Sequence, residues 1–80
     1  MVFEKVKEII VDTLNCEQDK VVMEADLKED IGADSLDAVE LNIALEEAFS
    51  IAIPDEDLAG FHTVADIVTY IQKNIDNTNE

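Results

Sequence analysis

A single serine stands among acidic residues at the start of an apolar run. The segment from Asp30 to Glu47 reads DIGADSLDAVELNIALEE and contains Ser35. A hydrolytic serine on a nucleophile elbow requires the pattern G-x-S-x-G after a strand, together with a histidine that accepts its proton. Gly32 has no second glycine to complete that pattern, and His62 is the only histidine in the chain. The residues therefore argue against Ser–His–Asp catalysis, and a helix-capping role is the simplest one for this serine.

Metal chemistry fits the sequence no better. A calcium loop that began at Asp26 would place Lys28 where an oxygen ligand is needed, Ile31 where glycine is needed and Asp37 where a bidentate glutamate is needed. One cysteine and one histidine are too few for a zinc site. We predict no catalytic residue and no metal site.

The charge balance indicates the kind of partner. The chain has 20 acidic residues against 5 lysines, and its net charge is −15. Phosphate backbones and anionic lipids would be repelled, so we expect neither nucleic acid binding nor stable membrane insertion. A protein with a basic patch is the natural partner. A lone cysteine, Cys16, fits a reducing compartment, and the N-terminus lacks a secretory apolar region, so we expect a cytoplasmic protein.

Apolar spacing predicts an all-α fold for a single domain that spans residues 1–80. A first helix is expected from Val2 to Leu14. A long polar loop follows, residues 15–34, and Gly32 ends it. The loop is expected to be pinned to the core by apolar side chains, namely Val21 or Val22, Leu27 and Ile31.

A second helix is expected from Ser35 to Phe49 or Ser50, with Asp34 or Ser35 as its N-cap. It carries two apolar stripes. One contains Leu41, Leu45, Ala48 and Phe49, and the other contains Leu36, Val39 and Ile43. Because one stripe is enough to face a core, the second is expected either to be covered or to await a partner.

The remaining residues predict a short helix and a final helix. Pro54 begins the short helix and Gly60 ends it. Thr63-x-x-Asp66 is a variant capping box for the last helix, and residues 76–80 are expected to fray. The core face of the last helix is predicted to contain Val64, Ile67 or Val68, Ile71 and Ile75. The result is a small four-helix bundle with three main helices, one short helix and a long loop between the first two.

The segment Gly32-Ala33-Asp34-Ser35-Leu36-Asp37-x-Val39-Glu40-Leu41 closely resembles the attachment motif of acyl carrier proteins. Ala44-Leu45-Glu46-Glu47-x-Phe49, Ile53-Pro54-Asp55 and Thr63-Val64 follow at the spacing of the same family, and length and acidity agree from end to end. The resemblance implies that Ser35 carries a covalent 4′-phosphopantetheine arm, which a phosphopantetheinyl transferase takes from coenzyme A. The serine then needs no base of its own.

The resemblance also implies roles for other residues. Asp34 and Leu36 flank the serine within the motif for the cofactor. The recognition strip would be Leu36, Val39 and Ile43, and the acidic rim would be Asp37, Glu40, Glu46, Glu47, Asp55 and Glu56. Leu45, Phe49, Ile53, Leu58 and Phe61 are candidates to line a cavity for the acyl chain. The implied partners are enzymes of fatty-acid synthesis with basic patches: ketosynthase, reductases, dehydratase, and malonyl and acyl transferases. A monomer is expected.

Two departures from the family pattern affect these expectations. Asn42 stands where valine is common, and we expect it to make the recognition strip more polar. Leu58 to His62 is more apolar and less charged than usual, which alters the expected cavity. The alternatives are a carrier of polyketide or D-alanyl cargo, and an unmodified acidic regulatory protein that binds basic enzymes.

Overall fold

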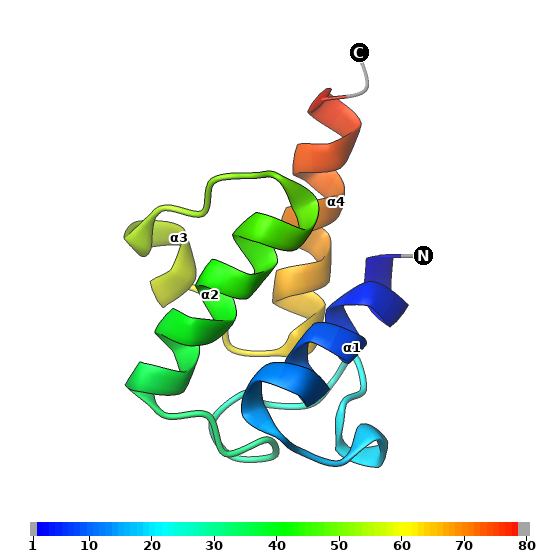
Figure 1. Ribbon diagram of the computed structural model, residues 1–80, viewed down its shortest axis with the longest axis vertical. Coiled ribbons are helices and arrows are strands. Elements are labelled where there is room, and N and C mark those ends of the chain that lie inside the picture. The colour runs from blue at the N-terminus through cyan, green and yellow to red at the C-terminus, as the bar shows by residue number, and fades with distance from the viewer. Residues whose placement is uncertain (1, 79–80) are drawn as a thin grey trace.

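The computed structural model describes residues 2–78, and these residues form an all-helical fold. In chain order, the elements are α1 (Val2–Leu14), the short 3₁₀ helix η1 (Gln18–Lys20), α2 (Ser35–Phe49), α3 (Asp55–Ala59) and α4 (Val64–Thr78). Figure 1 shows α1, α2 and α4 as the long elements, with α3 beside α2 at one edge of the molecule. The predicted four-helix bundle is confirmed, and the predicted bounds of the first helix match α1.

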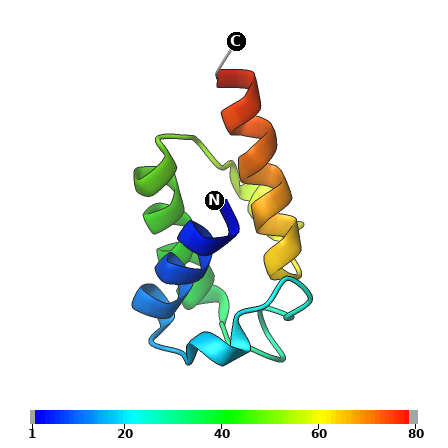
Figure 2. The same cartoon turned by 90° about the vertical axis from the view of Figure 1, so that its right-hand side faces the viewer.

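The core lies where the three long helices meet. α1 packs against both α2 and α4, and Figure 2 shows it between them. The buried aliphatic side chains recur at helical spacing in each helix: Val6 and Ile10 in α1, Leu41 and Leu45 in α2, and Val64, Ile67, Val68 and Ile71 in α4. Burying one such side chain contributes about 1.5–3 kcal/mol, and this term must outweigh repulsion among the carboxylates.

The long loop between α1 and α2 is fixed to this core. Val21 is fully buried whereas Val22 is exposed, so Val21 is the anchor of that pair. Leu27 and Ile31 are partly buried against the core, as predicted. The prediction of an irregular loop missed η1 and the burial of Ala25.

Backbone carbonyls of this loop bind the first turn of α4. The amide of Val64 donates to the carbonyl of Ala25 at 3.1 Å, and the amide of Ala65 donates to the carbonyl of Met23 at 2.9 Å. The first amides of an α-helix have no partner inside the helix, so an outside acceptor is needed when they are buried. The loop supplies that acceptor, and α4 in turn holds the loop.

The predicted capping box of α4 is also present. The amide of Asp66 donates to Thr63 Oγ1 at 3.3 Å. Asp66 Oδ2 accepts from the amides of His62 at 2.9 Å and Thr63 at 3.1 Å. These two backbone hydrogen bonds, from His62 first and Thr63 second, hold the pKa of Asp66 below its ordinary value of 3.8.

α4 extends beyond the core face that its sequence indicated. The helix continues through Thr78, and the fraying expected from residue 76 onward stays a prediction. The last part of the predicted frayed tail, residues 79–80, lies outside the described residues. None of the helices within residues 2–78 has the length and apolar content needed to cross a membrane.

The capping carboxylate should give α4 a pH-dependent share of stability. The folded-state pKa of Asp66 is lowered, so its contribution is complete above about pH 4 and is lost as the pH falls through the folded-state value. We expect Asp66→Asn to lower the free energy of unfolding near neutral pH, and this difference from the parent should shrink as the pH falls below about 4 and through the folded-state pKa.

The measurement is urea unfolding of both proteins across that pH range. Asp12→Asn, on an exposed position of α1, removes the same charge without removing a cap. A loss of stability for Asp66→Asn that stays constant with pH would contradict the capping role.

Candidate functional site

Ser35 is the first residue of α2, and the cap beside it leaves its hydroxyl free. Asp34 is the N-cap: its Oδ1 accepts from the amide of Asp37 at 2.9 Å, and Asp37 Oδ2 accepts from the amide of Asp34 at 3.3 Å. This reciprocal capping box resolves which residue caps the helix. Ser35 is exposed, and no hydrogen bond within the described residues engages its hydroxyl. Gly32, at φ +84°, supplies the left-handed turn that leads the chain into the helix.

Ser35 lies at the edge of an apolar cleft of about 510 Å³, here called the attachment cleft. Its walls come from the long loop, α2, α3 and the segment that joins α3 to α4. The apolar lining contains Leu27, Ala33, Ala38, Val39, Leu41, Leu58, Ala59 and Phe61, and the polar lining contains Lys28, Asp34, Ser35, Asp55 and His62. A serine at the rim of an apolar cleft can present an attached group either to solvent or to that cleft.

His62 shares this cleft, which its sequence position did not predict. A catalytic base must come within hydrogen-bonding distance of the serine, and no hydrogen bond joins Ser35 to His62 across residues 2–78. Asp66 binds the backbone amide of His62 and not its ring. The arrangement therefore lacks both links of a Ser–His–Asp triad.

The short helix α3 is held at one side of the cleft by a tyrosine of α4. The Tyr70 hydroxyl lies 2.8 Å from Asp57 Oδ2 and 3.3 Å from the carbonyl oxygen of Ala52. Its ring meets that of Phe61 edge to face, with centroids 5.4 Å apart. Partial burial, and then the hydrogen bond to Asp57, raise the pKa of Tyr70 above its ordinary value of 10.0. Sequence spacing gave no signal for this contact.

The loop between α2 and α3 is tied to α2 by two side chains one helical turn apart. Asn42 Nδ2 donates to the carbonyl of Ile53 at 3.3 Å, and Glu46 Oε2 accepts from the amide of Ile53 at 2.7 Å. Both backbone groups of one residue are thereby satisfied by α2.

The two hydrogen bonds between α2 and Ile53, here called the Ile53 clamp, correct the expectation for Asn42 and qualify the one for Glu46. Asn42 is 9% exposed, so it does not make the recognition strip more polar; it lies on the inner side of α2, and its Oδ1 has no partner. Glu46 is only half-buried, but its carboxylate already binds the chain itself. It is therefore less available to a partner than its neighbour Glu47, which is exposed.

The recognition strip is open to solvent. Leu36, Val39 and Ile43 are 66%, 49% and 51% exposed, and their spacing places them along one side of α2. Large aliphatic side chains exposed together are unusual on a protein this acidic. Among the residues of the acidic rim, Glu40, Glu47, Asp55 and Glu56 are exposed, whereas Asp37 is half-buried in the capping box.

Comparison with known proteins identifies the family. Residues 4–71 match the family profile described as "Phosphopantetheine attachment site". An acyl carrier protein from Akkermansia muciniphila is 56% identical over 70 residues, which cover 88% of each chain. One from Clostridium perfringens is 53% identical over 72 residues, which cover 90% of this chain and 95% of the relative. The chain belongs to the acyl carrier protein family.

The fold agrees with that family. A solved structure from Mycobacterium tuberculosis, assigned as an acyl carrier protein, superimposes with a TM-score of 0.80 at 30% sequence identity. The match covers 86% of this chain and 92% of that one.

The residues suggested for an acyl cavity occupy two different environments. Leu58 and Phe61 line the attachment cleft. Leu45 and Ile53 are buried in the core at 1% and 3% exposure, and Phe49 is partly buried against it. Leu45, Phe49 and Ile53 do not line the cleft, so they are not in contact with it as the candidate lining would require.

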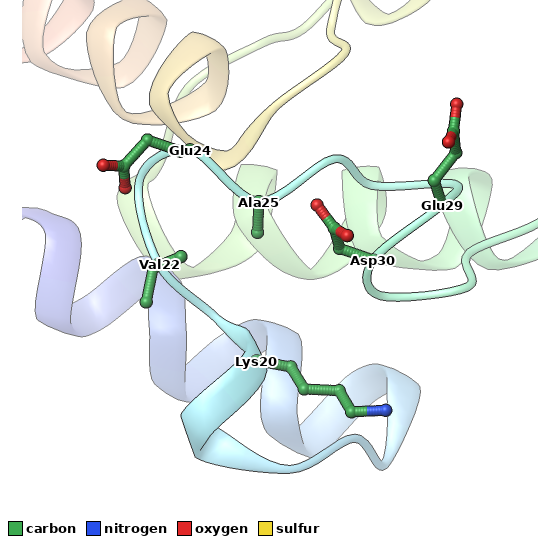
Figure 3. A pocket seen from close by; sticks show the side chains of 6 residues that line it. All are labelled: Lys20, Val22, Glu24, Ala25, Glu29 and Asp30. Atoms are coloured by element: carbon green, nitrogen blue, oxygen red, sulfur yellow. The ribbon is translucent and has the colours of Figure 1, made fainter.

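A second hollow lies in the long loop, away from Ser35. It has a volume of about 470 Å³ and is lined by Lys20, Val22, Glu24, Ala25, Glu29 and Asp30. Figure 3 shows that the carboxylates of Glu24 and Glu29 point in different directions. Asp30 Oδ2 accepts from the amide of Asp26 at 2.8 Å. Within the described part of the chain, no three His, Cys, Asp or Glu side chains gather to hold a metal ion.

Glu46 and Glu47 provide a matched test of the clamp in this carrier. Both are glutamates in the last turns of α2, but only Glu46 binds the amide of Ile53. We expect Glu46→Ala to lower the free energy of unfolding by about 1.5–3 kcal/mol, the range for a hydrogen bond to a charged group. Glu47→Ala should change it by less than about 0.5 kcal/mol. Urea unfolding at constant salt measures both, and equal effects would show that the clamp contributes nothing specific.

Proposed function

We propose that this chain carries acyl groups as thioesters on a 4′-phosphopantetheine arm attached to Ser35. It would pass them between the enzymes of fatty-acid synthesis. The observation that carries the proposal is the exposed, unengaged hydroxyl of Ser35 at the rim of an apolar cleft, within the segment that matches a phosphopantetheine attachment profile. When attached, the arm supplies a terminal thiol that holds the acyl group.

The residues around Ser35 fit a group that another enzyme attaches. The hydroxyl is accessible and not consumed by capping, because Asp34 performs that role. No base lies within hydrogen-bonding distance in the described residues, so the proton must be removed by a phosphopantetheinyl transferase. The N-terminal end of a helix is a favourable place for the phosphodiester, since the helix dipole and free amides attract negative charge.

The cleft would shelter part of the acyl chain, and the recognition strip would bind the partner enzymes. The apolar walls, including Leu58 and Phe61, offer part of an acyl chain a place away from water. Leu36, Val39 and Ile43 offer an apolar contact to a partner, and Glu40 and Glu47 surround it with negative charge. This combination favours basic partners: the transferase first, then ketosynthase, reductases, dehydratase, and malonyl and acyl transferases. We propose that it acts as a cytoplasmic monomer and performs no catalysis itself.

The attachment residue is tested by mass. We expect the parent protein, incubated with coenzyme A and a broad-specificity phosphopantetheinyl transferase, to gain one phosphopantetheine. Ser35→Ala should gain none, because it lacks the acceptor oxygen. Ser50→Ala, which changes an exposed serine just beyond α2, is the matched control and should still be modified. A gain in mass for Ser35→Ala would place the attachment elsewhere.

The recognition face is tested by binding kinetics of the modified carrier with a ketosynthase. Glu40→Lys should slow association and reduce its dependence on salt, because exposed charges act mainly on the encounter rate. Ile43→Ala should chiefly speed dissociation, by about fivefold for a loss of about 1 kcal/mol.

Lys73→Ala, an exposed position on α4, is the control and should leave both rates near those of the parent. Stopped-flow measurements at several salt concentrations give the rates. If all three variants bind alike, the exposed side of α2 is not the recognition face.

A further inference from the structure

An anionic group attached to Ser35 would enter a site that is already negative. The capping box places the carboxylates of Asp34 and Asp37 on either side of the serine. The box occupies two of the otherwise unpaired amides at this helix end, because Asp34 Oδ1 accepts from the amide of Asp37 and Asp37 Oδ2 accepts from the amide of Asp34. The helix end therefore has less free N–H capacity for a phosphodiester than an uncapped one would have.

Positive charge is scarce in this protein, yet two side chains that can carry it line the attachment cleft. Only five lysines and one histidine are present, and Lys28 and His62 both border the cleft that Ser35 borders. They also border a smaller adjoining hollow together. Both are exposed, so neither is needed for the core.

Backbone pairing brings these two residues together from distant parts of the chain. The amide of Leu27, next to Lys28, donates to the carbonyl of His62 at 2.9 Å. Asp26 precedes Leu27 and Thr63 follows His62, and these two residues form an isolated antiparallel bridge. The long loop and the segment before α4 are thus held side by side at the cleft.

Acidic groups near the pair moderate its charge. Hydrogen bonds from the amides of Glu29 and Lys28 lower the pKa of Asp26, so its carboxylate stays ionised close to Lys28 and His62. The charged groups around the pair from all neighbouring elements are Asp26 and Glu29 of the loop, Asp34 at the start of α2, Asp55 of α3 and Asp66 of α4. Asp26 and Asp66 already bind backbone amides through their carboxylates.

We infer that the Lys28 ammonium and the His62 imidazole together bind the phosphodiester of the group attached to Ser35 and direct the arm across the attachment cleft. This inference rests on the attachment proposed above. The phosphorus would be bonded directly to Ser35 Oγ, so the phosphate must lie beside Ser35, which lines the same cleft as Lys28 and His62. The carboxylate of a malonyl group, carried at the other end of the arm, is not held close to Ser35 in this way.

The test compares unmodified and phosphopantetheine-bearing protein, each verified by mass. In the parent, attachment should shift the NMR resonances of Lys28 and His62, although neither is adjacent to Ser35 in sequence. In Lys28→Gln and His62→Gln, the ³¹P resonance of the modified protein should move away from its position in the parent. Lys28→Gln should also lower the thermal midpoint by about 2–4 °C more in the modified than in the unmodified protein, as expected for an exposed ion pair in a domain this small.

Lys5→Gln, an exposed lysine of α1 that does not line the cleft, removes the same charge and should shift neither the ³¹P resonance nor the difference in midpoints. Two results overturn the inference directly: unshifted Lys28 and His62 resonances on attachment, or equal effects of Lys28→Gln and Lys5→Gln. Shifts that arise only after a malonyl group is loaded also overturn it, because Lys28 and His62 would then bind the malonyl carboxylate and not the phosphodiester. Absence of any gain in mass would instead refute the proposed attachment at Ser35.

Discussion

The hydrogen bonds between the long first loop and the start of α4 are the constraint on which the site depends. They satisfy the amides of Val64 and Ala65, which a helix cannot satisfy itself, and in return they fix a loop with little regular structure. The same pairing lays Leu27 against His62 and so builds one wall of the attachment cleft. Without it, the residues before Ser35 would have no fixed position relative to α3 and α4.

Carboxylates in this chain divide into those that bind backbone amides and those that stay exposed without such bonds within the described residues. Asp34, Asp37 and Asp66 bind backbone amides at helix ends, and Glu46 binds the loop that leads to α3. Each such hydrogen bond gives the carboxylate a favourable local contact, which offsets its repulsion by neighbouring carboxylates. The exposed acids on the outer side of α2, such as Glu40 and Glu47, make no such bonds within the described residues.

α3 is held in place mainly by contacts from neighbouring elements and not by burial of its own side chains. It is only five residues long and has no buried residue of its own. Tyr70 binds it from α4, and the clamp on Ile53 binds the loop before it from α2. Elements with few buried contacts are the first to open locally. A helix of this kind beside an apolar cleft can open locally without loss of the core formed by the three long helices.

The sequence by itself determined the helices, the principal site residue and the family resemblance. These depend on patterns local to the chain: apolar spacing gives α1, α2 and α4, the capping pattern gives the start of α4, and the motif around Ser35 gives the resemblance and the proposed attachment residue. The exposure of Leu36, Val39 and Ile43 was predictable for the same reason, since α2 has more apolar width than one core contact can cover.

Tertiary structure decided what depends on residues far apart in the sequence. Asn42 is next to the exposed Ile43 in sequence, but successive residues of a helix point in different directions, and Asn42 faces inward and binds Ile53. Lys28 and His62 look like unrelated surface residues until backbone pairing brings their segments to one cleft. Which acids are free and which are bound was equally hidden, because a hydrogen bond such as that from Ile53 to Glu46 requires the loop to fold back onto α2. Local spacing carries no information about such contacts, since they form only when the core fixes the distances between elements.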